Sequence, residues 1–150
     1  MMKKILSLFG LILILLICSC CHKHEYIDGV CECGSFSKEW LKVNFDINEK
    51  KSYFNGNAEQ DFTDDLIIVT LKKSTTYPIL NERHFKLDEP ITIEYTFIEP
   101  KSSEVAPNFH QILFIHLEPS SKEHIIELIN QIEQLPFVLA AEPNFVMHLE

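Results

Sequence analysis

Hydrophobic positions follow a regular pattern only in the second half of the chain, where they predict four strands. Residues 66–71 are almost continuously apolar and predict a strand at the centre of a sheet. Residues 91–97 alternate strictly between apolar and polar side chains, which predicts a half-buried strand. Residues 111–117 are again nearly all apolar and predict a third strand, and residues 137–141 predict a short fourth one.

A helix is predicted between the third and fourth strands. Ser120 and Glu123 have the spacing of a capping box, and Pro136 ends the helix because the residue before a proline is disfavoured in the α conformation. Apolar side chains recur between them on one stripe, at Ile125, Leu128, Ile129, Ile132 and Leu135. The segment 72–90 has room for a helical turn or two near residues 81–85.

The element order is therefore strand, weak helix, strand, strand, helix, strand. This order predicts an α+β domain with a ferredoxin-like split β-α-β-β-α-β antiparallel sheet and its helices on one face. The first and third strands would be central, and the second would lie at an edge. We assign this domain to residues 62–150. Residues 20–61 scatter their aromatics among Asn, Gly and charged residues, so we expect an irregular tether without a second core.

Residues 1–19 are typical of a signal peptide, because two lysines precede an apolar run at 5–17 that is too short to span a bilayer comfortably. A short transmembrane anchor is the alternative. The sequence Ile17-Cys18-Ser19-Cys20 resembles a bacterial lipoprotein signal, and Cys20 fits the lipidated position best, with Cys21 as its rival. An ordinary signal peptide with incidental cysteines is the other interpretation. The resemblance implies a palmitate-type lipid anchor and a membrane-bound protein of the bacterial cell envelope, facing the periplasm or the exterior.

The charge of the chain argues against nucleic acid as a partner. The formal net charge is −9, and it becomes −11 when Lys3 and Lys4 leave with the signal. Only four glycines occur and none forms a phosphate loop, while the serines that begin the helix have no triad partners. We therefore expect no enzymatic activity. His110 and His116 are expected to be solvated side chains of the third strand.

The set His22, His24, Cys31 and Cys33 has ligands that suit tetrahedral zinc, although C-x-C is not the usual spacing. Zinc is thus a candidate cofactor, and no other is expected. The alternative is that these cysteines form disulfides in an oxidising envelope. If Cys20 is lipidated, three cysteines remain and one thiol is left over.

Residues 137–146 resemble the end of subtilisin-family prodomains, and more narrowly the fervidolysin-like N-terminal prodomains, in which a V-x-x-A-E-P-N string follows the second helix. Residues 65–73 resemble the first strand of that family, so the likeness covers about residues 62–150. It implies a domain with the split sheet that templates the folding of its protease. It also implies inhibition by a C-terminal tail that lies in the substrate groove.

The resemblance also implies roles for individual residues. The tail 142–150 would leave the sheet as a free extended segment, and its last residues would occupy the P4 to P1 subsites in the order Met147, His148, Leu149 and Glu150. Glu142 matches a carboxylate that faces protease helix N-termini, whereas Asn144 replaces a second such carboxylate. The catalytic blocks of the protease are not found in the chain.

We therefore expect a lipid-anchored module that inhibits a subtilisin-like serine protease or assists its folding. One alternative is a structural or interaction lipoprotein without a protease partner. The other is a zinc-binding lipoprotein that uses the N-terminal His/Cys motif.

Overall fold

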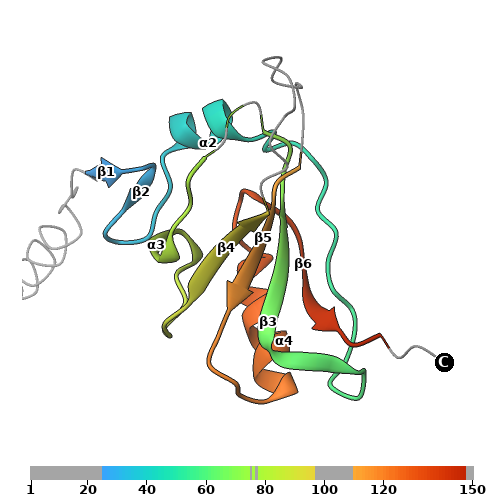
Figure 1. The fold of residues 1–150 in the computed structure, drawn as a ribbon. Helices are drawn as coiled ribbons and strands as arrows, with labels where there is room; N and C mark the ends of the chain where they lie inside the picture. Colours follow the sequence, from blue (N-terminus) through green and yellow to red (C-terminus); the bar gives the residue numbers. More distant parts are fainter. Residues whose placement is uncertain (1–24, 75, 77, 97–109, 148–150) are drawn as a thin grey trace, which may run out of the picture.

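A computed structural model describes residues 25–74, 76, 78–96 and 110–147 (Figure 1). It is a mixed α+β fold with two antiparallel sheets. In chain order the elements are β1 (Tyr26–Ile27), β2 (Val30–Cys31), α2 (Lys38–Asn44), β3 (Phe62–Leu71), α3 (Glu82–Phe85), β4 (Thr92–Thr96), β5 (Ile112–His116), α4 (Lys122–Ile132) and β6 (Val138–Phe145).

The larger sheet has the strand order β4-β5-β3-β6, and all neighbouring strands are antiparallel. All four predicted strands are present, and the first and third are central as expected. The predicted helix is α4, but its N-cap is Ser121, one residue later than expected, with its side chain accepting from the N–H of His124. The backbone N–H of Ser120 instead donates to the carbonyl oxygen of Asp64, which ties that residue to β3.

The expectation of a split β-α-β-β-α-β arrangement is met only in part. The element between β3 and β4 is α3, a single turn of four residues. It starts at a capping box between Asn81 and His84, and it ends where Lys86 takes a left-handed conformation with φ of 55°. A second full helix that covers the sheet between these strands is not present in the described part of the chain. The coarser description, an α+β fold around an antiparallel sheet, holds.

The expected tether, residues 20–61, is described from residue 25 onward, and between residues 36 and 54 it packs against the core of the domain. Phe137, which is completely buried, has its ring centroid 5.4 Å from that of Phe36, 5.6 Å from that of Phe45 and 5.8 Å from that of Phe85. Residues on both sides of the expected domain boundary thus belong to one core. The cause is that a few well-placed aromatics bury enough area to hold an irregular segment.

Residues 50–56 run beside β6, as Figure 1 shows to the right of the sheet. The N–H of Ser52 donates to the carbonyl oxygen of Leu139 at 2.9 Å, and the N–H of Phe54 donates to a carboxylate oxygen of Glu133 at 2.6 Å. The ammonium of Lys51 donates to the carbonyl oxygens of Glu133 and Leu135, the second at 2.7 Å, close to the end of α4. The segment therefore shields part of the outer edge of β6.

Candidate functional site

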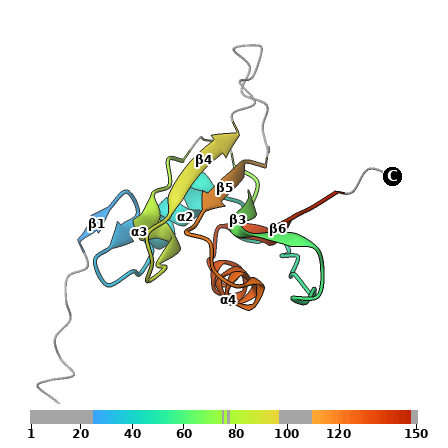
Figure 2. The same ribbon diagram turned by 60° about the horizontal axis from the view of Figure 1, so that its bottom comes forward.

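The two faces of the larger sheet have different surroundings. One face carries the fully buried side chains Ile67, Val69, Leu71, Leu113 and Ile115. Helix α4 covers this face with buried residues that include Ile125 and Ile129. Figure 2 shows α4 against this side of the sheet, whereas the opposite side of β3 and β5 carries no described helix.

The opposite side, called the open face below, has an apolar centre. Its central side chains alternate with the buried ones and are Leu66, Ile68, Ile112 and Phe114. They are half-buried or exposed, and Ile112 is 39% exposed. Grouped apolar side chains at the surface of a small domain are typical of interaction sites.

Two carboxylates border this apolar centre. In the register of the sheet Glu94 lies opposite Phe114, Phe114 lies opposite Ile68, and Ile68 lies opposite Glu142. Because neighbouring strands are about 4.8 Å apart, the two glutamates stand about 14 Å apart at the ends of one row. Both side chains are exposed. The open face therefore offers an apolar strip between two anionic ends.

His110, which precedes β5, and His116, the last residue of β5, contact different carboxylates. His116 lies on the open face, with its Nε2 3.0 Å from a carboxylate oxygen of Glu94. The Nε2 of His110 is 2.9 Å from a carboxylate oxygen of Glu49. Burial acts to raise the pKa of Glu49, but the backbone N–H of Lys73 and the imidazole of His110 lower it on balance. Both histidines are partly exposed, as expected for solvated side chains.

The expected free tail is shorter than predicted, because β6 continues to Phe145. Glu142 pairs with Ile68 and Phe145 pairs with Phe62, while the N–H of Val146 donates to the carbonyl oxygen of Asp61 at 3.0 Å. Asn144 is half-buried within the same strand. Residues 142–146 are therefore held against β3 and Asp61 within the protein's own sheet and do not form a free tail.

Met147 is the first residue of the C-terminal segment that projects into solvent. Its side chain is 87% exposed. His148, Leu149 and Glu150 lie outside the described residues. The structure thus places Glu142 on the open face and Met147 beyond the last strand, with β6 connecting them.

The predicted His/Cys site is only partly described. Cys31 and Cys33 form a disulfide with their Cα atoms 5.3 Å apart, and a sulfur in a disulfide is not a thiolate ligand. His22 and His24, like Cys20 and Cys21, lie outside the described residues. Within the described residues no group of three or more His, Cys, Asp or Glu side chains is arranged to hold a metal ion.

Sequence reasoning missed His84, a completely buried histidine that joins the N-terminal hairpin to α3. Its Nδ1 accepts from the N–H of Asn81, so its Nε2–H donates to the carbonyl oxygen of Asp28 at 3.0 Å. Asp28 and Gly29 form the two-residue hairpin turn, with φ of 51° and 83°. The Asp-Gly pair was a visible turn signal, but nothing in the sequence links that turn to His84.

Glu133 lies off the apolar stripe of the helix, where a solvated side chain is expected, yet it is only 2% exposed. Burial raises its pKa, against the opposing effects of the backbone N–H of Phe54, the ammonium of Lys51 and the backbone N–H of Ala141. Glu133 therefore connects the end of α4 to the segment 50–56 and to β6. The helix pattern alone predicts a solvated position, which becomes an interior one only because the segment 50–56 lies over it.

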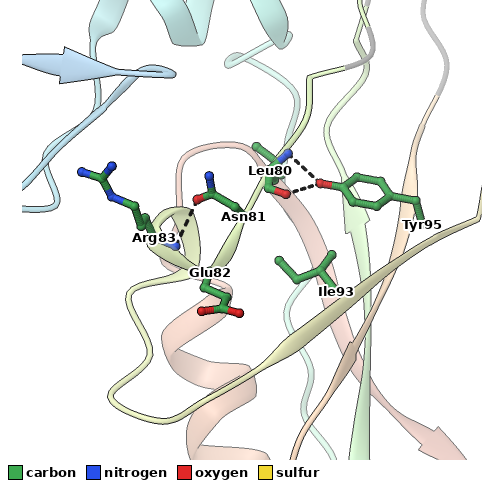
Figure 3. A pocket seen from close by; sticks show the side chains of 6 residues that line it. All are labelled: Leu80, Asn81, Glu82, Arg83, Ile93 and Tyr95. Carbon is green, nitrogen blue, oxygen red and sulfur yellow. Dashed lines mark hydrogen bonds between the residues drawn. The ribbon is translucent and has the colours of Figure 1, made fainter.

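A pocket of about 410 Å³ lies between α3 and β4 (Figure 3). It is lined by Leu80, Asn81, Glu82, Arg83, Ile93 and Tyr95. The Tyr95 hydroxyl donates to the carbonyl oxygen of Leu80 and accepts from its N–H at 2.6 Å. Burial raises the pKa of Tyr95 more than the bond to Leu80 lowers it. In Figure 3 the Arg83 side chain extends away from Tyr95, and the surface that lines the pocket is mainly apolar.

Comparison of the chain with protein-family models, with curated proteins and with solved structures finds no match. In the described part of the chain no helix is both long and apolar enough to cross a membrane.

Proposed function

We propose that this chain is a non-enzymatic module that binds a subtilisin-like serine protease, as an inhibitor or a folding helper. The observation that carries the proposal is the row Glu94, Phe114, Ile68 and Glu142 on a face of the sheet that no described helix covers. An apolar strip with anionic ends is suited to receive protein helices, because helix N-termini attract carboxylates through unpaired N–H groups and the helix dipole. Glu142 is also the residue to which the prodomain resemblance assigns this role.

The position of the C-terminal segment supports the same partner. Glu142 and Met147 are five residues apart, and β6 is hydrogen-bonded along most of that distance. At about 3.3 Å per extended residue, the segment that starts at Met147 emerges about 17 Å from Glu142. Docking of the open face would therefore bring residues 147–150 to a defined place, such as a substrate groove. A segment held in this way loses little entropy on binding.

The same proposal includes a fold of the split β-α-β-β-α-β type. The sheet would be a reduced form of the split β-α-β-β-α-β arrangement of these prodomains, in which the single turn α3 stands at the position of the first helix. The segment 36–56 would then be an addition that fills the core beside that short turn.

The N-terminus would attach the module to the bacterial envelope. A lipid on Cys20 leaves five residues before β1, and an extended chain of that length reaches only about 20 Å. The module would therefore work close to the membrane surface, where its protease partner would also have to be found.

The test is inhibition of a panel of subtilisin-like proteases by the purified chain. Deletion of residues 147–150 should abolish inhibition and leave the circular dichroism of the sheet unchanged, since the last sheet contact is made by Val146. A deletion variant that inhibits as well as the parent would refute the tail mechanism.

Two further variants test the open face through binding to a catalytically inactive protease. Ile112→Ser should weaken binding about tenfold, because it removes apolar area from the strip. Glu142→Gln should weaken it about two- to fivefold, as expected for one carboxylate at a helix N-terminus. Val43→Ser, on α2 and 66% exposed, is the matched control and should change nothing.

The alternative is an interaction lipoprotein whose open face binds a protein other than a protease. The same open face favours it, but it gives the C-terminal segment no role. Partner binding that is lost in Ile112→Ser and retained after deletion of residues 147–150 would identify this alternative.

A further inference from the structure

A second pocket, of about 310 Å³, lies at the N-terminal hairpin and contains the disulfide. Both cysteines line it, together with the basic residues Arg83 and Lys86 and the acidic residues Glu32 and Asp88. The two sulfur-bearing residues differ in access, because Cys31 is 4% exposed whereas Cys33 is exposed. A disulfide with one accessible end in a pocket is positioned to react with a thiol from outside.

We expect the disulfide to contribute little to the stability of the fold. The loop that carries the disulfide is already closed by backbone hydrogen bonds, from the N–H of Cys31 to the carbonyl oxygen of Ser35 at 3.0 Å and from the N–H of Ser37 to that of Gly29 at 2.8 Å. His84 anchors the hairpin turn to α3. A bond that closes a loop across a single residue also constrains the unfolded chain least. Reduction should therefore leave the fold intact.

The side chain of Lys86 lies across the loop that follows the disulfide. Its ammonium is 4.6 Å from the centroid of Phe36, and a Cβ atom at Gly34 would be 2.9 Å from its Cε. Gly34 has a φ of 78°, so a side chain there would be strained as well as crowded. The glycine thus allows the lysine to pass close to the disulfide loop. A nearby cation favours a thiolate over a thiol, and the two acidic residues oppose this effect.

We propose that Cys31 and Cys33 form a thiol–disulfide exchange site that oxidises a dithiol in a partner or client protein. A thiolate of the client attacks the Sγ of Cys33, the more exposed of the two residues, the bond between Cys31 and Cys33 breaks, and Cys31 leaves as a thiolate that takes up a proton. The second client thiolate then attacks the client sulfur of the mixed disulfide and releases Cys33. The client gains a disulfide and loses two electrons, and the pair Cys31 and Cys33 becomes a dithiol. This activity does not depend on protease binding.

The first experiment mixes the full oxidised chain with a reduced model peptide that contains two cysteines. Peptide mapping by mass spectrometry after alkylation assigns each thiol separately, which distinguishes Cys31 and Cys33 from the cysteines at 18, 20 and 21. We expect peptide oxidation to match the appearance of both thiols, with unchanged circular dichroism. Failure to oxidise the peptide, or reduction that requires unfolding, would overturn the proposal.

Variants test the order of events and the role of the pocket. Cys31→Ser should leave a Cys33 thiol that alkylates rapidly, and Cys33→Ser should leave a Cys31 thiol that alkylates at least tenfold more slowly. Reduction by dithiothreitol, which attacks as a thiolate anion, should slow at least threefold in the pair Arg83→Gln and Lys86→Gln. It should accelerate in the matched pair Glu32→Gln and Asp88→Asn. Equal rates in the two charge variants, or equal alkylation of the two cysteines, would contradict the mechanism.

Discussion

The segment 36–56 and the unit formed by α4 and β6 contribute to the same core in different ways. The α4–β6 unit buries side chains at regular intervals, such as Ile125, Leu128, Ile129 and Ile132 along one stripe. The segment has only the short helix α2 and otherwise irregular backbone, and it contributes a few aromatics spaced without period. Both regions meet at Phe137.

The difference shows that a segment can bury side chains in a core even when its apolar positions are not regularly spaced. A helix must repeat its apolar positions because its geometry presents the same face every three to four residues. An irregular segment is held by individual anchors and by backbone hydrogen bonds, such as the bond from Ser52 to Leu139. Its sequence therefore resembles a linker even where it completes a core.

The largest effect is expected from removal of the segment. A chain that begins at Phe62 would lose Leu41 and Phe45 from the core and expose Phe137. We expect no cooperative thermal unfolding transition, since a domain of this size has only about 5–15 kcal/mol of stability. Calorimetry of the truncated chain would decide this. A normal transition would restore the tether hypothesis.

Phe137→Ala should be the most damaging single substitution in this comparison. The ring is completely buried and contacts Phe36 of the segment and Phe85 of α3, so we expect a loss of about 3–5 kcal/mol in the free energy of unfolding. Denaturant titration measures it. A double-mutant cycle with Phe45→Ala should give a coupling of about 0.5–1.5 kcal/mol, and strict additivity would show that the two regions pack independently.

Glu133 and Glu49 should affect stability with opposite pH dependence. The folded-state pKa of Glu133 is raised above the usual 4.5, so its contribution is complete below pH 4.5 and is lost as the pH rises through the folded-state pKa. Glu133→Gln should therefore gain stability relative to the parent as the pH rises through that window. Urea titrations between pH 3 and 8 measure the difference.

Glu49→Gln is the matched control for that comparison. The folded-state pKa of Glu49 is lowered from 4.5, so its contribution is present above pH 4.5 and is lost as the pH falls through the folded-state pKa. This variant should gain stability relative to the parent as the pH falls. A shared direction for the two variants would mean that Glu133 is not buried by the segment 50–56.

The smallest effects should come from adjacent aromatics of the segment itself. Phe54 is half-buried, with its ring centroid 6.4 Å from that of Phe145, and Phe54→Ala should cost about 1–2 kcal/mol. Tyr53 is 60% exposed, and Tyr53→Ala should cost about 0.5 kcal/mol or less. Thermal melts of the two variants would separate an anchoring residue from its solvated neighbour. Equal losses would indicate that the segment does not lie against β6 as described.

The sequence alone determined the elements that are specified by side chains close together along the chain. The strands of the larger sheet, α4 and the central positions of β3 and β5 follow from alternation, from continuous apolar runs and from the proline that ends the helix. These signals are reliable because each depends on side chains within one element. The open face was implied only indirectly, because β3 and β5 are apolar on both sides and the sequence does not state which side is covered.

Tertiary structure decided everything that depends on contacts distant in sequence. The burial of Glu133 and His84, the extension of β6 to Phe145 and the packing of Leu41 and Phe45 into the core each require a partner that is remote along the chain. A local pattern cannot specify such a partner, since loop closure and packing act between segments. The physical difference is that secondary-structure preferences belong to a single segment, whereas packing and hydrogen-bond energies between segments exist only when the two segments are in contact.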